Sequence, residues 1–431
     1  MKCAPIILTC LSCALLNAQA IDSSKQEGIV QTMDDGTRPV RSAKLPALSF
    51  YGEVIQYLLD GNDAMPPNVV SWQRRGDPPA LNWFLQVHIA PALTGDETLL
   101  TLQEMTDGTA AMIVLVPRGG INFWYQMSEP CLTGQTLIVE ETAKRLAFVR
   151  IRLTEMEFPD VRRMIRDFKE LKAQFFFSDP KAMVLDGISY SFKGRAPSWN
   201  FDVHTDNPDP DNPLAKWADD CHSVIWKLVN EDPVHGMKGH PITSVDKDCI
   251  GPVLLRASAG SGNVDDVRQL LKLSVPVNGV DYWDGRTALL SAAQSYELDV
   301  VKILLEAGAD PRAVNLNGES AIRLLPDEYG PGFRTGKTEL PEWSRAYVQR
   351  AEKRTKVAEL LKRAGTPIDD VDGDGLTPLM VAIQRQDIQL AKWLVENGAD
   401  PKKKDKAGKT ALDHAHESKD PKVLASLQGI L

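Results

Sequence analysis

The sequence predicts an α+β domain followed by an all-α array of stacked two-helix units. The array is indicated by a stretch that occurs twice in the same order of turn, helix, break, helix and stop, at Asp284–Pro311 and again at Asp374–Pro401. Recurrence of one supersecondary unit is typical of a repeat architecture. The α+β domain is indicated by the region before the array, where segments of period two alternate with segments of helical spacing.

Composition places the chain among ordinary soluble proteins. Its 431 residues are enough for two to three domains, and 43% of them are hydrophobic and 25% charged. The formal net charge of −9 argues against general binding to nucleic acid or to anionic membranes, because both need clustered positive charge. We therefore expect no nucleic-acid partner.

Residues 1–20 have the three parts of a secretory signal peptide. Lys2 supplies the positive charge, Pro5–Leu16 is a short apolar segment, and Ala18-Gln19-Ala20 is an A-x-A cleavage site. The prediction is export, with the periplasm favoured because no Asn-x-Ser/Thr site occurs. Secretion and lipid anchoring are the alternatives.

After the signal, the polar residues 21–46 are predicted to form a flexible lead-in. No later apolar run has the roughly twenty residues that a membrane span needs.

Residues 47–230 are predicted to form the α+β domain. Tyr51–Leu59 has helical spacing, and Leu81–Ile89 alternates apolar and polar residues like a half-buried strand. Further strands are expected at 98–103, 110–116, 146–153, 184–192 and 200–204, and further helices at 158–171 and 214–229.

No established catalytic or metal-binding motif occurs in this domain. Asp202 and His204 lie on one face of a strand by period two, which suits a general base with its orienting carboxylate. A pair of polar surface residues is the simpler interpretation. The prediction is therefore no metal, no cofactor and no enzyme activity, with catalysis left open for residues 47–230.

Residues 231–250 combine Pro, Gly and charge without a period and are predicted to be a linker. Beyond them, turn glycines recur with spacings of 34, 33, 57 and 33 residues, at Gly251, Gly285, Gly318, Gly375 and Gly408. A period of about 33 residues with two helices and a hairpin is typical of ankyrin repeats. Residues 251–431 resemble that family, most clearly in GRTALLSAAQSYELDVVKILLEAGADP and GLTPLMVAIQRQDIQLAKWLVENGADP.

Local chemistry supports about five stacked repeats. Hydroxyl side chains, which can cap free backbone N–H groups, open the first helices at Thr287, Ser320, Thr377 and Thr410. Glycines, which accept a positive φ, end the second helices at Gly308, Gly365 and Gly398.

The third repeat is interrupted between its helices, since the spacing of 57 residues exceeds 33 by 24. Pro326–Glu339 is expected to be loop, and Glu342–Ala364 one long helix that starts after Pro341. The insertion is either a tolerated surface segment or a segment that packs on the N-terminal domain.

Ankyrin repeats bind proteins through their hairpin tips and first helices, so the resemblance implies a protein partner. The candidate binding residues at the tips are Tyr282, Trp283, Asn315, Asn317, Asp372, Asp374, Lys404 and Lys406. Tyr282 and Trp283 are large aromatics, which suits either an interface anchor or packing within the chain.

Three cysteines lie beyond the signal peptide, namely Cys131, Cys221 and Cys249. At most one intramolecular disulfide can form among them.

The function expected from these features is non-catalytic protein binding by an exported protein, in its sharper form as an inhibitor or immunity partner of a toxin or enzyme. The alternatives are an enzyme whose N-terminal domain is catalytic and whose repeats dock the substrate, and a structural adaptor of the cell envelope.

Overall fold

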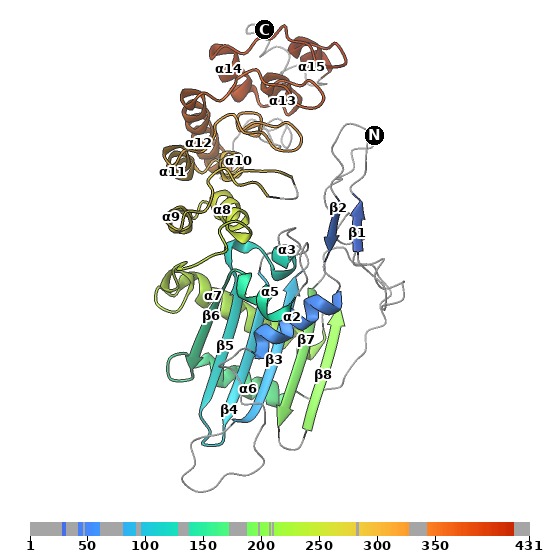
Figure 1. Cartoon of the computed structure of the whole chain (residues 1–431), viewed down its shortest axis with the longest axis vertical. Coiled ribbons are helices and arrows are strands. Elements are labelled where there is room, and N and C mark those ends of the chain that lie inside the picture. The colour runs from blue at the N-terminus through green and yellow to red at the C-terminus, as the bar shows by residue number, and fades with distance from the viewer. Residues whose placement is uncertain are drawn as a thin grey trace. The chain divides into compact units, whose positions relative to one another are not determined.

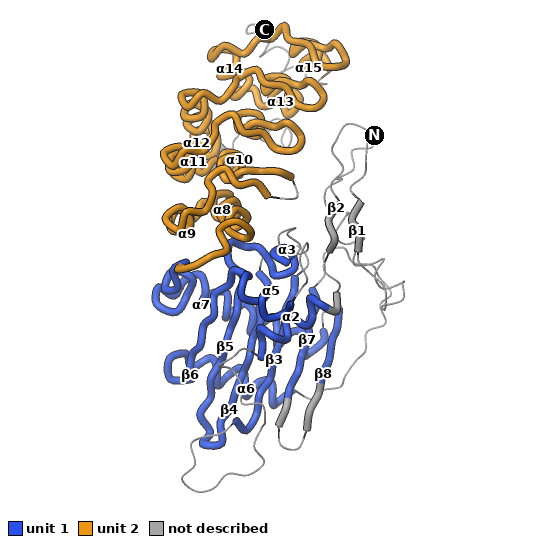
Figure 2. The backbone as a smooth tube through the Cα atoms, viewed as in Figure 1, with its two compact units in different colours: residues 1–32, 42–242 blue, residues 33–41, 243–431 orange. Residues whose placement is uncertain are grey.

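The computed structural model describes residues 28–31, 42–45, 48–60, 81–91, 96–127, 138–171, 188–196, 199–206, 208, 211–281, 284–326 and 343–417. The described residues form two compact units, the first within 28–31 and 42–242 and the second within 243–417, and Figure 2 colours the two units differently. The boundary falls inside the stretch predicted as a linker. Each unit is considered by itself below.

The first unit is built on a sheet of six antiparallel strands in the order β6-β5-β4-β3-β7-β8 (Figure 1). The strands are β3 (Leu81–Pro91), β4 (Thr98–Met105), β5 (Ala110–Pro117), β6 (Phe148–Thr154), β7 (Ile188–Ala196) and β8 (Trp199–Asp206). The turn between β4 and β5 contains Gly108 at a φ of 84°, as its Asp-Gly sequence predicts. The strands expected at 184–192 and 200–204 correspond to β7 and β8, which pair with each other.

One face of this sheet carries the main apolar core. Leu85, Val87 and Ile89 of β3 project into it by period two, together with matching residues of the neighbouring strands. Helices α6 (Asp160–Glu170) and α7 (Pro213–Glu231) cover this face (Figure 1). Trp217 of α7 donates its indole N–H to the carbonyl of Met164 at 3.0 Å and so ties the two helices together.

The opposite face is covered by α2 (Leu48–Asp60), α3 (Phe123–Met127) and α5 (Val139–Arg145) (Figure 1). Because of this second layer, β3 is buried on both faces, and the expectation of a half-buried strand is wrong. Its polar residues Gln86 and His88 are buried under the helices and do not face solvent.

Four further elements of this unit lie outside the six-stranded sheet. Short 3-10 helices occur at Arg118–Gly120 (η1) and Met237–Gly239 (η2). In the stretch expected to be a flexible lead-in, β1 (Gly28–Gln31) pairs antiparallel with β2 (Ser42–Leu45), a pairing that the sequence did not predict.

The second unit consists of short antiparallel helices joined by hairpins. Its helices are α8 (Ile250–Gly260), α9 (Val264–Lys272), α10 (Ala288–Gln294), α11 (Leu298–Glu306), α12 (Trp343–Ala364), α13 (Pro378–Gln384), α14 (Ile388–Glu396) and α15 (Ala411–Glu417). Buried leucines fill the interior between helices, with Leu304, Leu361 and Leu394 fully buried. Leu305 and Leu360 are half-buried, and Leu424 lies outside the described residues.

The predicted caps are present at Thr287, Thr377 and Thr410, which open α10, α13 and α15. Ser320 caps a turn at residues 321–324, where the expected first helix of the third repeat is not formed. Thr287, Ser320, Thr377 and Thr410 each accept a hydrogen bond from the backbone N–H three residues later, at 3.3 or 3.4 Å. Pro378 occupies the first turn of α13, as expected.

Glycines end the second helices as predicted, since Gly308, Gly365 and Gly398 have φ values of 88°, 95° and 101°. Gly251 is different, because it lies in the first turn of α8 and not in a hairpin. Its alignment with the hairpin glycines was wrong. A side chain there would meet Val275 at 3.1 Å, so close packing on Val275 explains the glycine.

Helix α12 has 22 residues, whereas the other second helices α9, α11 and α14 have nine each. The prediction of one long helix after Pro341 is thus confirmed. Its additional turns reach Tyr296 in the turn between α10 and α11, where the guanidinium of Arg350 lies 5.1 Å from the ring centre. Tyr296 has a φ of 60°, and its hydroxyl donates to the carbonyl of Leu325 at 2.8 Å.

Among the helices that the structure describes, none is both long and apolar enough to cross a membrane.

Candidate functional site

Four hairpins connect the units of the repeat region, at residues 280–287, 314–320, 371–377 and 404–410. Each is organised by one acidic or amide side chain that follows its first residue. Asp281, Asn315, Asp372 and Asp405 accept hydrogen bonds from backbone N–H groups of their own hairpin. Such Asx contacts close a turn locally. These buried or half-buried polar side chains therefore belong to the architecture.

Three of these four residues also contact a basic side chain. Arg256 contacts Asp281 at 2.7 Å, Arg323 contacts Asp372, and His414 contacts Asp405 at 2.9 Å. The acidic groups of Asp281, Asp372 and Asp405 are almost fully buried. Ion pairing offsets the cost of burying each carboxylate.

Neighbouring hairpins are joined by backbone hydrogen bonds that all run in one direction. The N–H of Leu316 donates to Asp284, that of Gly373 to Asn317, and that of Lys406 to Asp374. The donor–acceptor distances are 2.8, 3.3 and 3.1 Å. The hairpins therefore form one continuous ladder, which continues past the interruption in the third repeat.

Along this ladder runs a row of exposed side chains, one from each hairpin, at the position just before its Asx residue. Val280, Val314 and Val371 are 51%, 48% and 50% exposed, and the equivalent residue of the last hairpin is the exposed Lys404. We call these three valines the valine row. A set of equivalent apolar side chains on rigidly linked hairpins is the surface feature that a protein partner can use.

The last hairpin differs from the others by its positive charge. Lys402, Lys404 and Lys406 are exposed around it, and Lys403 reaches back to the carbonyl of Asp369. The valine row thus ends in a basic region, which favours a partner with carboxylates at the corresponding end.

The predicted tip residues differ in how far their side chains are exposed. Asp374, Lys404 and Lys406 are exposed, Asn317 is half-buried, and Asp372 is held by Arg323 and by its own turn. Asn315 is buried, with its amide donating to Glu319 at 2.7 Å. Tyr282 and Trp283 lie outside the described residues. The valine row beside these tips was missed, because a single valine in a hairpin has no distinctive sequence signal.

The cysteines considered for a disulfide differ in their redox state. Cys221 is a free and buried thiol, and burial raises its pKa. Cys249 is disulfide-bonded, with a partner outside the residues that the structure describes. Cys131 lies outside them as well.

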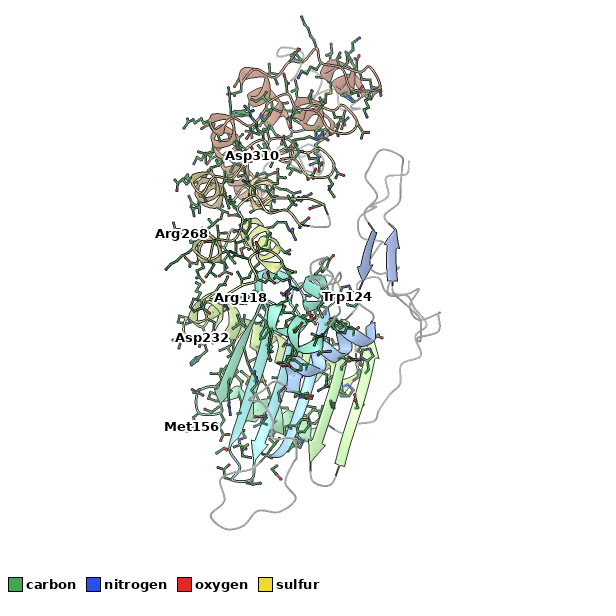
Figure 3. All side chains as sticks on the ribbon, in the orientation of Figure 1. Arg118, Trp124, Met156, Asp232, Arg268 and Asp310 are labelled. Atoms are coloured by element: carbon green, nitrogen blue, oxygen red, sulfur yellow. The ribbon has the colours of Figure 1, made fainter. Side chains whose placement is uncertain are left out.

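The first unit holds a second polar site, between β3, β4 and α2. Glu97 is 1% exposed, and its carboxylate accepts from the hydroxyl of Tyr51 at 2.5 Å, from the ring of His88 at 2.7 Å and from the N–H of Phe123 at 2.6 Å. Burial, followed by the charge of Glu97, raises the pKa of Tyr51 well above its ordinary value. Trp124, labelled in Figure 3, packs edge-on against Tyr51 with ring centres 5.2 Å apart.

This cluster joins a histidine with a carboxylate, the pairing that acid–base chemistry uses. Sequence analysis missed it, since Tyr51, His88 and Glu97 come from three separate elements. In the described residues, no group of three or more His, Cys, Asp or Glu side chains has the arrangement of a metal site.

Comparison with known proteins agrees with the geometry of the second unit. Residues 211–315 match a family described as ankyrin repeats (3 copies), and residues 362–415 match one described as ankyrin repeats (many copies). The first match begins at residue 211, two residues before α7, and so includes the whole of that helix. The buried side chains of α7 pack on the sheet, so the helical repeats themselves begin at α8.

The matches to curated relatives cover only part of this chain and part of each relative. The mitochondrial disaggregase of Bos taurus is 29% identical over 200 residues, which are 46% of this chain and 25% of that protein. The L-asparaginase of Dirofilaria immitis is 29% identical over 203 residues, 45% of this chain and 30% of that protein. The ankyrin repeat protein YahD of Escherichia coli (strain K12) is 28% identical over 181 residues, 37% of this chain and 87% of that protein.

This chain therefore spans under a third of the length of the disaggregase and the asparaginase. The two family matches and the hairpin ladder agree on one conclusion: the C-terminal region of this chain consists of ankyrin repeats.

Proposed function

We propose that this protein is exported and binds a protein partner along its stacked hairpins, acting as an inhibitor or immunity partner of a toxin or enzyme. The observation that carries the binding surface is the valine row, because its three side chains lie at equivalent positions of linked hairpins. Backbone hydrogen bonds between neighbouring hairpins keep the valine row rigid, so little conformational entropy is lost on binding.

Two features support export. Residues 1–20 have the parts of a signal peptide. The disulfide of Cys249 suits an oxidising compartment such as the periplasm. N-terminal sequencing of the protein recovered from the periplasm should give Ile21 as the first residue, and an intact Met1 in the cytoplasmic fraction would contradict export.

The binding surface is tested with a triple variant, Val280→Ser, Val314→Ser and Val371→Ser. A partner is first captured from periplasmic extract by the wild-type protein and purified, and its dissociation constant is then measured by calorimetry. Each valine should contribute about 0.5–1 kcal/mol from the apolar area that it still exposes. The triple variant should bind roughly 10- to 100-fold more weakly.

Val234→Ser is the matched control, because Val234 is an exposed valine of the first unit. It should leave the affinity unchanged. Equal affinity of wild type and triple variant would show that the partner does not use the valine row, and Trp283→Ala then tests the predicted aromatic tip instead. The inhibitor assignment requires that the purified partner loses its enzymatic or toxic activity when the wild-type protein is added.

A second candidate function is favoured by the buried contact of His88 with Glu97. In this alternative the repeats hold a substrate protein and the first unit modifies it.

A further inference from the structure

At one edge of the sheet, β7 and β8 run side by side (Figure 1). Polar residues alternate with apolar ones along both strands. The register pairs Ser189 with Asp206, Ser191 with His204 and Lys193 with Asp202. Directly paired residues of neighbouring strands point to the same face. One face of this two-stranded edge therefore collects a serine pair, a lysine, a histidine and two carboxylates.

Ser191, His204 and Asp206 form a continuous chain of contacts on this face. The hydroxyl of Ser191 lies 2.7 Å from Nδ1 of His204, and Nε2 of the same ring lies 3.3 Å from the carboxylate of Asp206. A neutral imidazole has one donor and one acceptor nitrogen. Because Nε2 faces the carboxylate, the ring proton is stabilised there, and Nδ1 can accept the proton of Ser191.

The charges around the ring agree with this arrangement. The hydrogen bond to Asp206 raises the pKa of His204, with smaller contributions from the charges of Asp206 and Asp202. The same contact lowers the pKa of Asp206, so its carboxylate stays ionised. Lys193 places a cation on this face, and its ammonium group donates to Gln56 of α2 at 3.1 Å.

Ser191 has a second histidine on its other side. His88 of β3 is its direct partner in the register between β3 and β7. Nε2 of His88 contacts Glu97, whereas Nδ1 has no hydrogen bond to any residue that the structure describes. The serine thus lies in a cross-strand row between two histidines, each held by its own carboxylate.

From this row we propose that Ser191, His204 and Asp206 form a nucleophilic site that hydrolyses small carboxylic esters. Ser191 is the nucleophile, His204 the general base and Asp206 the positioning residue. A nucleophile, a base within hydrogen-bond reach and a third group that orients the base are the parts that such a site requires.

The reaction has two balanced steps. The oxygen of Ser191 bonds to the ester carbonyl carbon as its proton moves to His204, and the bond to the alkoxy group breaks, with that proton going to the departing alcohol. Water then attacks the acyl-serine and gives a proton to His204. The proton returns to Ser191 as the carboxylic acid leaves.

Two other histidines of this unit, His222 and His235, lack one of the parts. His222 contacts the hydroxyl of Thr98 at 3.0 Å, but no ion pair with a carboxylate is present for it among the described residues. His235 lies 3.5 Å from Asp232, which is labelled in Figure 3, and has no hydroxyl contact among the residues that the structure describes. His235 therefore serves as a control for a half-buried histidine beside a carboxylate.

The test uses the full-length protein with p-nitrophenyl acetate as substrate and a fluorophosphonate as covalent probe. Wild type should hydrolyse the ester, and intact-mass and peptide analysis should locate the probe on Ser191. Ser191→Ala should abolish labelling and lower the rate at least tenfold. His204→Asn should lower it roughly 100-fold, within the range expected for loss of a general base.

Asp206→Asn distinguishes positioning from a structural role. The rate should rise with pH as His204 loses its proton, and loss of the carboxylate should move this rise to lower pH while it reduces the maximum rate. Controls His235→Asn and Ser223→Ala, an exposed serine of α7, should keep both rate and labelling. Hydrolysis by wild type that is no faster than by Ser191→Ala, or a probe adduct on another residue, would overturn the proposal. Partner binding does not enter these assays, so their outcome is independent of the proposed function.

Discussion

The two units use buried polar side chains in different ways. In the repeats, such residues serve needs that recur with the period: a threonine caps a helix, and an aspartate or asparagine closes a hairpin. In the first unit, Glu97 and His88 serve no recurring local need and contact side chains from other elements. Buried polar side chains in the repeats are therefore part of the architecture, whereas those in the six-stranded sheet mark a candidate functional site.

The largest loss of stability should follow from disrupting the buried ion pair between Arg354 and Asp387. This pair tests whether buried polar side chains of the repeats are needed for their architecture. Both side chains are 1% exposed, and Asp387 also caps α14 by accepting from the N–H of Leu390. Asp387→Ala leaves the guanidinium buried without its counter-ion and should cost about 3–5 kcal/mol in free energy of unfolding. Urea denaturation monitored by circular dichroism measures this loss.

A double variant separates charge from packing. Arg354→Met with Asp387→Ser removes both charges and keeps a capping hydroxyl, so it should be less destabilised than Asp387→Ala alone. A loss below about 1 kcal/mol for Asp387→Ala would show that this pair is not needed by the repeats.

An intermediate effect is expected for Glu97→Ala in the first unit. The substitution leaves the donors of Tyr51, His88 and Phe123 without their acceptor, at a cost of about 2–3 kcal/mol. Thermal denaturation of the variant is compared with that of Glu140→Ala, an exposed residue paired with Lys144, which should change the free energy of unfolding by less than about 0.5 kcal/mol. An equal change in the free energy of unfolding for Glu97→Ala and Glu140→Ala would show that the buried carboxylate contributes no more to stability than the surface one.

The smallest effect concerns Asp284 at the first hairpin. Burial, and then the neighbouring carboxyl of Asp281, raises its pKa to about 6, although Arg286 lies 2.7 Å away. The folded state therefore binds more protons than the unfolded state, so stability should fall as pH rises from about 4 to about 6. Asp284→Asn should flatten this dependence in melting temperatures measured across that range, and an unchanged slope would show that Asp284 does not titrate there.

The repeats could be predicted from sequence because their rules are local. Thr377, Pro378 and Gly398 fulfil their roles within a few residues of their own position, so spacing alone identifies them. Gly251 shows the limit, since it continues the spacing but lies in a helix.

The site of the sheet depends on strand order and register. His88, Ser191 and His204 are far apart in sequence and become neighbours only because β7 pairs with β3 on one side and β8 on the other. The period-two analysis correctly placed His204 on a polar strand face. It paired His204 with Asp202, whereas the structure gives Asp206 as its contact, because side-chain direction along a strand is not set by spacing.

The one-directional ladder of hairpins has a consequence for how this protein can change over evolutionary time. Asn317 and Gly373 are hydrogen-bonded neighbours although the interrupted third repeat separates them in sequence. Residues inserted between the two helices of a repeat thus leave the hydrogen bonds between neighbouring hairpins in place. Selection can lengthen or exchange the segment before α12 while the hairpin side of the array keeps its form, so the two can diversify separately.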